Sequence, residues 1–397
     1  MKWKFYSLAF VAGMSILTAC SSDDNNDNDG NGGNGNGNEI ENGTILKGTI
    51  TSDVTLAAGN TYKLSGEYIV EEGGTLHIEE GVKIIAVYDD IADYILVKQG
   101  GKINAVGTPD KPIVMTSEKE EPGAWGGIHI CGRAHTNAEG GKGSSEIGGA
   151  VYGGNDDADN SGTLQYIRLE YTGFAFDEEH EANGISFYSV GNGTIVDHCQ
   201  AYKGSDDGFE FFGGSVNVSN LVAVSCSDDS FDWTEGWNGK GTNLVAYQEA
   251  ESTLGYDCDC LMECDNNGSN NAATPVAHPV LKNLILVGNG GSKQGIRLRA
   301  GTEVEIDNAK VCGKGQPLTV ETALTENALK NGTSKLTNIT LTSELSSKEG
   351  IYTHADFIAV TSNKVDANLS YSSFEDIRKE SVSYTHLRAH ETTLHLV

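Results

Sequence analysis

The chain of 397 residues carries a formal net charge of −29, from 27 Lys and Arg against 56 Asp and Glu. Nucleic acids and anionic membranes are bound by clustered Lys and Arg, so this composition argues against nucleic acid as a partner and favours cations. Fifty glycines and short β-rich runs separated by Gly, Asn and Asp indicate an all-β chain with many turns.

The first predicted element, residues 1–19, has the order of a bacterial secretory signal. Lys2 and Lys4 precede an apolar run at residues 5–17, which is too short to span a bilayer comfortably. The run ends in Leu-Thr-Ala before Cys20, which resembles the lipobox of bacterial lipoproteins. The resemblance implies acylation of Cys20 and anchoring in outer-membrane lipid. An ordinary secretory signal is the alternative.

Residues 20–40 are predicted to form a disordered acidic tether. From residue 21 to residue 38 the chain contains only Ser, Asp, Asn and Gly, which cannot bury apolar surface. The pair Asp23 and Asp24 resembles the surface-export signal of Bacteroidetes lipoproteins. This resemblance implies display on the cell surface rather than orientation toward the periplasm.

Residues 41–381 are predicted to form one solenoid domain, because a motif recurs in them. Asp-Asp-Gly-Phe-Glu-Phe at residues 206–211 returns 22 residues later as Asp-Asp-Ser-Phe-Asp-Trp at residues 228–233. A repeat of about twenty residues is the length of one coil, and stacked coils bury a shared core at a strand spacing of about 4.8 Å. We therefore expect an all-β, right-handed parallel β-helix. A jelly roll or a propeller is the rival architecture, but neither predicts this recurrence.

Six motifs support the same fold, at residues 123–128, 152–164, 206–214, 228–233, 263–266 and 295–299. Together they resemble a family of Bacteroidetes surface lipoproteins of largely unknown function. The resemblance covers about half of the chain, from residue 122 to residue 313. It implies a β-helix at the cell surface and brings no established reaction with it.

If one period is one coil, acidic residues stack in three rows. These rows are Asp206 on Asp228, Asp207 on Asp229, and Glu210 on Asp232. Like charges at this spacing repel by roughly 1 kcal/mol in water and 3 to 4 kcal/mol at an effective dielectric of 20. Solvent screening on an exposed turn, a bound cation, or protonation of one member of each pair would offset the repulsion.

Calcium is the cation that such rows suit, because it takes six to eight oxygen ligands and glycine-rich turns add carbonyl groups. The spacing is not that of an EF-hand. The candidate metal ligands are the six acids of the three rows.

The catalytic alternative uses Asp206, Asp207, Asp228 and Asp229 as acid and base on a sugar chain. The acidic pair is similar to the arrangement in polygalacturonase-type glycosidases. However, their His-Gly dipeptide is missing and only Arg297-Leu298-Arg299 stands in for their Arg-x-Lys. Either arginine would also serve as the base of a polysaccharide lyase. The structural alternative is that both form salt bridges to the acidic rows.

Aromatic residues lie near the acids in sequence. Strand alternation predicts that Phe209, Phe211, Phe231 and Trp233 form an inward stack. The remaining candidates, which we expect to form an exposed surface for packing against sugar rings, are Phe212, Trp237 and Trp125. The loop at residues 174–180 also gathers apolar, acidic and imidazole groups.

Two further features are interpreted separately. Cys258, Cys260 and Cys264 crowd together, which predicts one disulfide, with a zinc site completed by His278 as the alternative. Residues 382–397 hold three of the ten histidines and look like a non-native read-through tail, with a His-rich metal site as the alternative.

Taken together, these patterns predict a cell-surface lipoprotein with a calcium-stabilised β-helix that binds glycan or another surface macromolecule. The alternative is a polysaccharide lyase or glycoside hydrolase. Carboxylates that converge in an open groove beside an arginine would favour the enzyme, and carboxylates fanned out along a flat turn would favour the scaffold.

Overall fold

The computed structural model describes residues 38–89, 91–176 and 180–380. The predicted signal, Cys20, most of the predicted tether and the predicted tail at residues 382–397 lie outside the described residues. The first strand, β1 (Asn38–Ile40), begins three residues before the start that we predicted for the solenoid.

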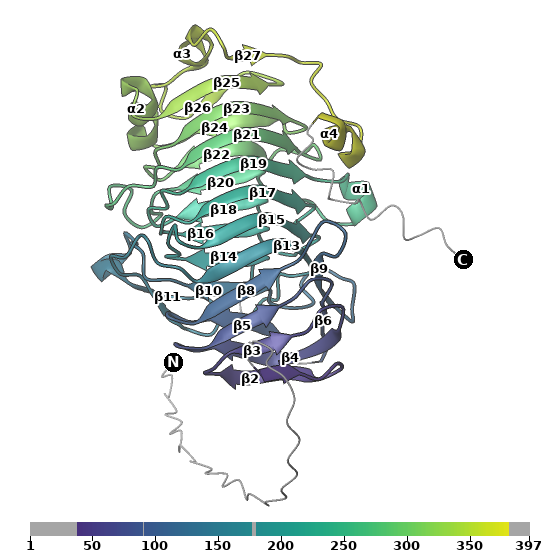
Figure 1. Ribbon diagram of the computed structural model, residues 1–397. Coiled ribbons are helices and arrows are strands. Elements are labelled where there is room, and N and C mark those ends of the chain that lie inside the picture. Colours follow the sequence, from purple (N-terminus) through teal and green to yellow (C-terminus); the bar gives the residue numbers. More distant parts are fainter. Residues whose placement is uncertain (1–37, 90, 177–179, 381–397) are drawn as a thin grey trace, which may run out of the picture. The chain divides into compact units, whose positions relative to one another are not determined.

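The strands stack coil on coil into a parallel β-helix (Figure 1), and 25 of them form one continuous network. Each coil contributes to three rows of paired strands, which we call faces A, B and C. Every strand pairing within these rows is parallel, and the short pair β11 and β12, which lies outside the rows, is antiparallel. The predicted all-β parallel β-helix is therefore confirmed.

Face A begins with β1, β3 (Val54–Leu56), β5 (Thr75–Ile78) and β8 (Lys102–Val106). Face B contains β6 (Lys83–Ala86), β9 (Ile113–Ser117) and β27 (Lys364–Val365). Seven bent strands belong to face A with their first half and to face B with their second: β13 (Gly162–Glu170), β15 (Ile195–Tyr202), β17 (Asn217–Val224), β19 (Lys240–Tyr247), β21 (Val280–Val287), β23 (Glu305–Cys312) and β25 (Lys335–Leu341).

Face C contains β7 (Tyr94–Val97), β10 (Ile128–Cys131), β14 (Ile185–Tyr188), β16 (Phe209–Phe212), β18 (Phe231–Thr234), β20 (Met262–Asp265), β22 (Gln294–Arg299), β24 (Gln316–Val320) and β26 (Ser346–Ser347). Two strands turn from face B into face C: β2 (Ile45–Ile50) and β4 (Thr61–Val70).

A single left-handed residue bends each strand from face A to face B. In the later coils this residue is Asn220, Asn243, Asn283, Asn308 or Asn338, with φ between 53° and 63°. Asparagine tolerates this conformation better than most residues with a Cβ atom. Its amide also donates to the side-chain oxygen one coil below, from Asn243 to Asn220 at 2.9 Å and from Asn283 to Asn243 at 3.0 Å. We call this column the asparagine ladder.

The space between the three faces is filled by one apolar core. The rings of Phe187 and Phe211 stack at 5.1 Å, and Phe209 stacks on Phe231 at 5.6 Å. Phe209, Phe211, Phe231 and Trp233 are at most 2% exposed. The predicted inward stack is therefore confirmed.

Segments outside the coils cover parts of the outer surface. The loop between β10 and β13 includes a short 3-10 helix (Glu139–Gly141), β11 (Gly143–Ser144) and β12 (Val151–Tyr152). Its Ile147, Ala150 and Tyr152 pack on outward side chains of face C. The helix α4 (Phe374–Glu380) packs on the outside of face B through Ile377.

Three further helices are α1 (Glu251–Leu254), α2 (Ala323–Asn331) and α3 (His354–Ala359). Leu329 of α2 and Phe357 of α3 join the core at the end of the solenoid where the last coils lie. None of the helices in the described residues has the length and apolar character needed to cross a membrane.

Candidate functional site

Next to the part that the loop between β10 and β13 covers, the outer surface of face C carries a column of charged side chains. Phe209 and Phe211 point inward, so the residue between them, Glu210, points outward. Strand pairing places Glu210 beside Asp232, Asp232 beside Glu263, and Glu263 beside Arg297. These four residues, one from each of β16, β18, β20 and β22, form the charged column.

A second row of acids lies in the turns that lead into the same strands. The Oδ1 atom of Asp207 accepts a hydrogen bond from the backbone N–H of Asp229 at 2.8 Å. The Oδ1 atom of Asp229 accepts one in turn from Cys260 N–H at 2.6 Å. The stacking of Asp207 and Asp229 on neighbouring coils, predicted from the 22-residue period, is therefore present.

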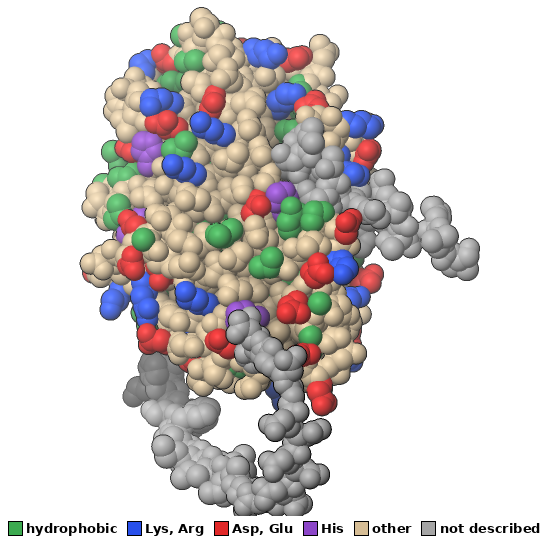
Figure 2. All heavy atoms as spheres, viewed as in Figure 1, with side chains coloured by type: hydrophobic (Ala, Val, Ile, Leu, Met, Phe, Trp, Pro, Cys, Tyr) green, Lys and Arg blue, Asp and Glu red, His purple; other side chains and the backbone are tan. Residues whose placement is uncertain are grey.

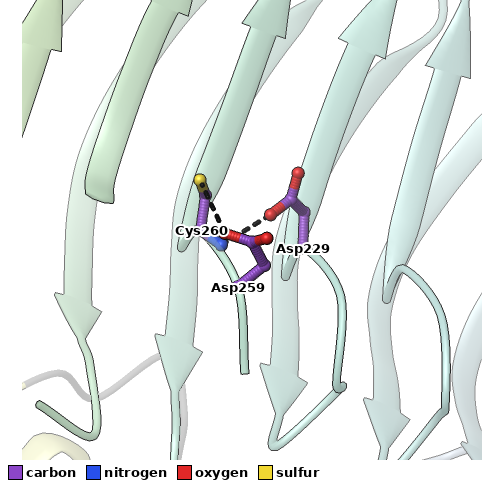
Figure 3. Close-up of side chains that lie close together, drawn as sticks. All are labelled: Asp229, Asp259 and Cys260. Atoms are coloured by element: carbon purple, nitrogen blue, oxygen red, sulfur yellow. Dashed lines mark hydrogen bonds between the residues drawn. The ribbon is translucent and has the colours of Figure 1, made fainter. Parts of the chain in front are cut away.

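The next coil contributes Asp259 and Cys260 in place of an Asp-Asp pair (Figure 3). Asp229, Asp259 and Cys260 each have a ligand atom within 4.8 Å of the others. The thiol of Cys260 donates to the Oδ1 of Asp259 at 3.4 Å. The row thus continues over three coils, with a thiol replacing the last buried carboxylate.

Both rows open into one cleft of about 370 Å³, which we call the acidic cleft. Its lining consists of ten carboxyl groups and one guanidinium group: Glu146, Glu181, Asp206, Asp207, Glu210, Asp228, Asp229, Asp232, Asp259, Glu263 and Arg297. On the side of the molecule drawn in Figure 2, by contrast, most acidic side chains stand apart from one another.

Three of the ten acids of the cleft are buried and five are partly buried. Asp206 is 8% exposed, and Asp207 and Asp229 are each 5% exposed, whereas Asp228 is exposed. The alternative that solvent screens the repulsion on an exposed turn therefore does not apply to Asp206, Asp207 and Asp229. The physical reason is that their turns are folded against the next coil by the hydrogen bonds described above.

Burial and mutual repulsion raise the pKa values of these carboxyl groups. Burial, followed by the charge of Asp228, raises the pKa of Asp206 to about 8. Burial raises the pKa of Glu146 to about 7. Burial and the neighbouring carboxylates hold the pKa values of Asp207, Asp229 and Asp232 well above their ordinary range. The cleft therefore favours any ligand that supplies positive charge.

Three overlapping groups of carboxylates have oxygens within 4.8 Å of one another. They are Asp206 with Asp207 and Asp228, Asp207 with Glu210 and Asp232, and Asp229 with Asp232 and Glu263. All six acids predicted as metal ligands belong to these groups. One member stands out, because the Oδ1 of Asp232 is inaccessible to solvent and accepts no hydrogen bond from any described residue.

The two arginines form salt bridges at one end of the cleft. Arg297 contacts Glu263 at 2.7 Å and Glu321 at 3.3 Å, and Arg299 contacts Asp265 at 2.7 Å and also pairs with Glu263. Burial lowers the pKa of Arg297, but hydrogen bonds and charge from Glu321 and Glu263 outweigh it and raise the pKa overall. A guanidinium in this setting keeps its proton.

The predicted sugar platform is wrong, because its aromatic residues are buried. Trp125 and Trp237 are 1% exposed and Phe212 is 8% exposed. Trp237 stacks on Phe211 at 4.2 Å inside the core, and Phe212 stacks on Tyr188 at 4.4 Å. Trp125 donates its Nε1–H to Glu170 O at 2.7 Å. Trp125 and Trp237 lie outside the strands, where alternation does not set side-chain direction, whereas Phe212 points outward from β16 and is covered by the loop that contains Tyr152.

The predicted disulfide is also wrong. Cys258, Cys260 and Cys264 are free and buried, like the other four described cysteines. His278 pairs with Glu303 at 3.0 Å, and no group of metal-ligating residues in the described ranges combines it with the three thiols.

Several residues of the cleft were missed from the sequence. Asp259 and Glu263 form a third copy of the motif, but it comes 31 residues after the second instead of 22. An inserted segment that contains α1 hides the period. Glu146 and Glu181 come from loops outside the repeat, so no spacing could have indicated them.

A family model for pectate-lyase-like β-helix domains matches residues 48–384. The chain belongs to this family. No curated protein and no solved structure matches the chain. The family match agrees with the parallel strand pairing and with the β-helix that the sequence motifs implied.

Proposed function

We propose that the protein is a cell-surface lipoprotein whose acidic cleft binds calcium and, through it, a glycan. The observation that carries the calcium site is the Oδ1 of Asp232, a buried carboxylate oxygen without a hydrogen-bond donor, set between Glu210 and Glu263. A buried charge needs a partner, and a cation is the partner that a ring of carboxylates lacks.

Of the three ways to offset the repulsion, burial weakens solvent screening. Protonation neutralises a carboxyl group only below its raised pKa, which is about 6 for Asp228, about 7 for Glu146 and about 8 for Asp206, so this offset is lost as pH rises. A divalent cation neutralises two charges at once, and calcium accepts six to eight oxygens in flexible geometry. Asp207 and Asp232 are each shared between two carboxylate groups, so ions on adjacent coils would share ligands.

Calcium titration by isothermal calorimetry tests this proposal. Wild-type protein stripped with EDTA should bind calcium, and calcium at one hundred times the dissociation constant should stabilise the fold by about 2.7 kcal/mol. Asp232→Asn should weaken binding without breaking a hydrogen bond. Asp53→Asn, at an exposed aspartate outside the cleft, is the matched control. An unchanged melting temperature with and without EDTA would remove calcium from the proposal.

The glycan part of the proposal follows from what the cleft leaves open. Asp228 is exposed at its mouth, so an ion held there keeps coordination positions for hydroxyl or carboxylate oxygens of a sugar.

Anchoring through Cys20 is tested separately, by incorporation of labelled palmitate that Cys20→Ser should abolish.

Hydrolysis of a glycan is a second candidate function, favoured by the pair Asp206 and Asp228. Their oxygens lie within 4.8 Å, and their pKa values are raised to about 8 and about 6. Partial loss of hydration, followed by the charge of Asp259, raises the pKa of Asp228. Two carboxyls with separated pKa values suit an acid and a base, and this short distance is nearer to the roughly 5 Å of retaining glycosidases than to inverting ones.

Incubation with a panel of acidic and neutral polysaccharides distinguishes the two functions. New reducing ends that form without unsaturated products and disappear in Asp206→Asn would establish hydrolysis, and new reducing ends together with unsaturated products would indicate a lyase. A lyase is less favoured, because Arg297 and Arg299 are already held in salt bridges.

A further inference from the structure

A second depression lies on the same edge of face C, in earlier coils. It has a volume of about 930 Å³, and we call it the aromatic groove. Its lining comes from β2, from the bend of β4, from the turn before β7 and from the loop before β14: Lys47, Gly48, Ser65, Gly66, Glu67, Ile91, Ala92, Tyr94, Phe174, Ala175 and Phe176.

Three aromatic rings shape this groove. Phe174 and Phe176 meet edge to face at 5.1 Å, and Phe176 meets Tyr94 edge to face at 6.0 Å. These contacts hold Phe176 in place although 43% of its surface is exposed. An exposed ring fixed by two others offers an apolar face at low entropic cost.

Polar groups surround this apolar face. The Tyr94 hydroxyl donates to Glu67 Oε2 at 2.9 Å, which leaves the second carboxylate oxygen of Glu67 as an acceptor. Lys47 is exposed and forms no ion pair within the described part of the chain. The groove thus combines an aromatic face with hydrogen-bond donors and acceptors around its edge.

One loop connects the groove to the acidic cleft. Ala175 lines the groove and pairs as an antiparallel bridge with Glu181, which lines the cleft. The N–H of Phe176 donates to His180 O at 2.9 Å and closes the same pairing. The two depressions are therefore lined by the two paired segments of one loop.

We propose that the aromatic groove is a carbohydrate-binding subsite, in which a pyranose ring packs on Phe176 and hydroxyl groups bond to Glu67 and Lys47. The glycan continues across the loop into the acidic cleft. This inference rests on the glycan part of the proposed function. A protein partner fits less well, because only Ile91 and Phe176 expose large apolar surface in the groove, whereas protein interfaces bury about 800 Å² per partner.

Binding of defined hexasaccharides by the full chain tests the subsite. Cellohexaose, xylohexaose, mannohexaose and hexagalacturonate are titrated calorimetrically, with calcium and with EDTA. Phe176→Ala should weaken binding of the accepted oligosaccharide on the order of tenfold. Ile195→Ala removes an equally exposed apolar side chain (51%) on another face and should bind as wild type does. Calcium binding should be the same in all three proteins.

The outcomes separate the two proposals. Equal glycan affinity of Phe176→Ala and wild type, or no binding of any hexasaccharide by a wild type that binds calcium, overturns the subsite and leaves the calcium site. Glycan binding that depends on Phe176 but persists in EDTA supports the subsite and overturns the bridging role of calcium. A Phe176→Ala protein that loses calcium binding as well would show a folding defect, and Lys47→Ala then decides: undiminished glycan affinity in that variant overturns the subsite.

Discussion

The asparagine ladder and the charged column are built by the same coil stacking and have opposite energetic consequences. In the ladder, Asn243 and Asn283 each donate to the oxygen of the asparagine below and accept from the one above. In the column, Glu210, Asp232 and Glu263 are also stacked in register, but an ionised carboxylate only accepts. Stacked amides supply hydrogen-bond donors and acceptors to one another, whereas stacked carboxylates need a donor or a cation from another group.

In a solenoid, a polar side chain at one position of a coil recurs at the same position of the neighbouring coils, so its hydrogen-bonding character is repeated along the stack. A stacked side chain that both donates and accepts stabilises its column, whereas a stacked carboxylate that only accepts leaves its neighbour without a donor.

The largest effect should appear in the pH dependence of stability without calcium. The pKa values of Asp228, Glu146 and Asp206 are raised to about 6, 7 and 8. Raised pKa values mean that their contribution is fully present below the unfolded values near 4 and is lost as pH rises through the folded values. In EDTA, the free energy of unfolding should fall by on the order of several kcal/mol between about pH 5 and pH 8.

Urea unfolding across this range measures the fall. Saturating calcium should flatten the profile, because the cation replaces the protons. A profile in EDTA that is already flat would mean that the carboxylates of the cleft do not repel one another as proposed.

Glu326, a buried carboxylate that accepts hydrogen bonds, should give the opposite pH dependence of stability. Glu326 of α2 accepts backbone hydrogen bonds from Glu349 at 2.8 Å, Ile351 at 2.6 Å and Tyr352 at 3.0 Å. Burial raises its pKa, but these hydrogen bonds outweigh it, so the pKa is lowered and the stabilisation is lost as pH falls through the folded value. Glu326→Ala should destabilise by about 3 kcal/mol, because it leaves buried N–H groups unsatisfied.

Thermal unfolding of Glu326→Ala and Glu326→Gln provides the comparison. The glutamine keeps an acceptor oxygen, so it should lose less than the alanine. Equal losses in both variants would attribute the effect to packing rather than to the hydrogen bonds.

Breaking the ladder should cost about 2 kcal/mol. Asn243→Leu loses both amide hydrogen bonds and places a branched side chain at φ 57°. Asn243→Gly keeps the backbone conformation and loses only the hydrogen bonds, so it should be destabilised by about 1 kcal/mol. Chemical denaturation measures both, and a glycine variant less stable than the leucine variant would contradict the ladder argument.

The smallest effect should be a gain in stability when one step of the column is made ladder-like. In Glu210→Gln, the new amide can donate to the unpartnered Oδ1 of Asp232 and removes one repulsion. In EDTA, the variant should be more stable than wild type by about 1 kcal/mol, and its calcium affinity should fall. Glu139→Gln, at an exposed glutamate, is the matched control. A destabilised Glu210→Gln would place the repulsion elsewhere.

The coil length and the stacking of the acidic rows follow from the 22-residue spacing alone. The 22-residue recurrence places Asp207 beneath Asp229 and Glu210 beside Asp232, because one period of a solenoid is one coil. Alternation within a strand likewise determined the inward stack of Phe209, Phe211, Phe231 and Trp233, since successive side chains of a strand point to opposite faces.

Which other side chains line the cleft, and which aromatic residues are buried, depends on tertiary contacts that no spacing in the sequence indicates. Glu263 and Arg297 enter the charged column across insertions that lengthen their coils, and Glu146 and Glu181 come from loops with no period. Trp125, Trp237 and Phe212 proved to be buried, because at corners and under loops the direction of a side chain depends on what packs against it. Periodicity is a local property of the chain, whereas burial and the convergence of charge depend on contacts between distant segments.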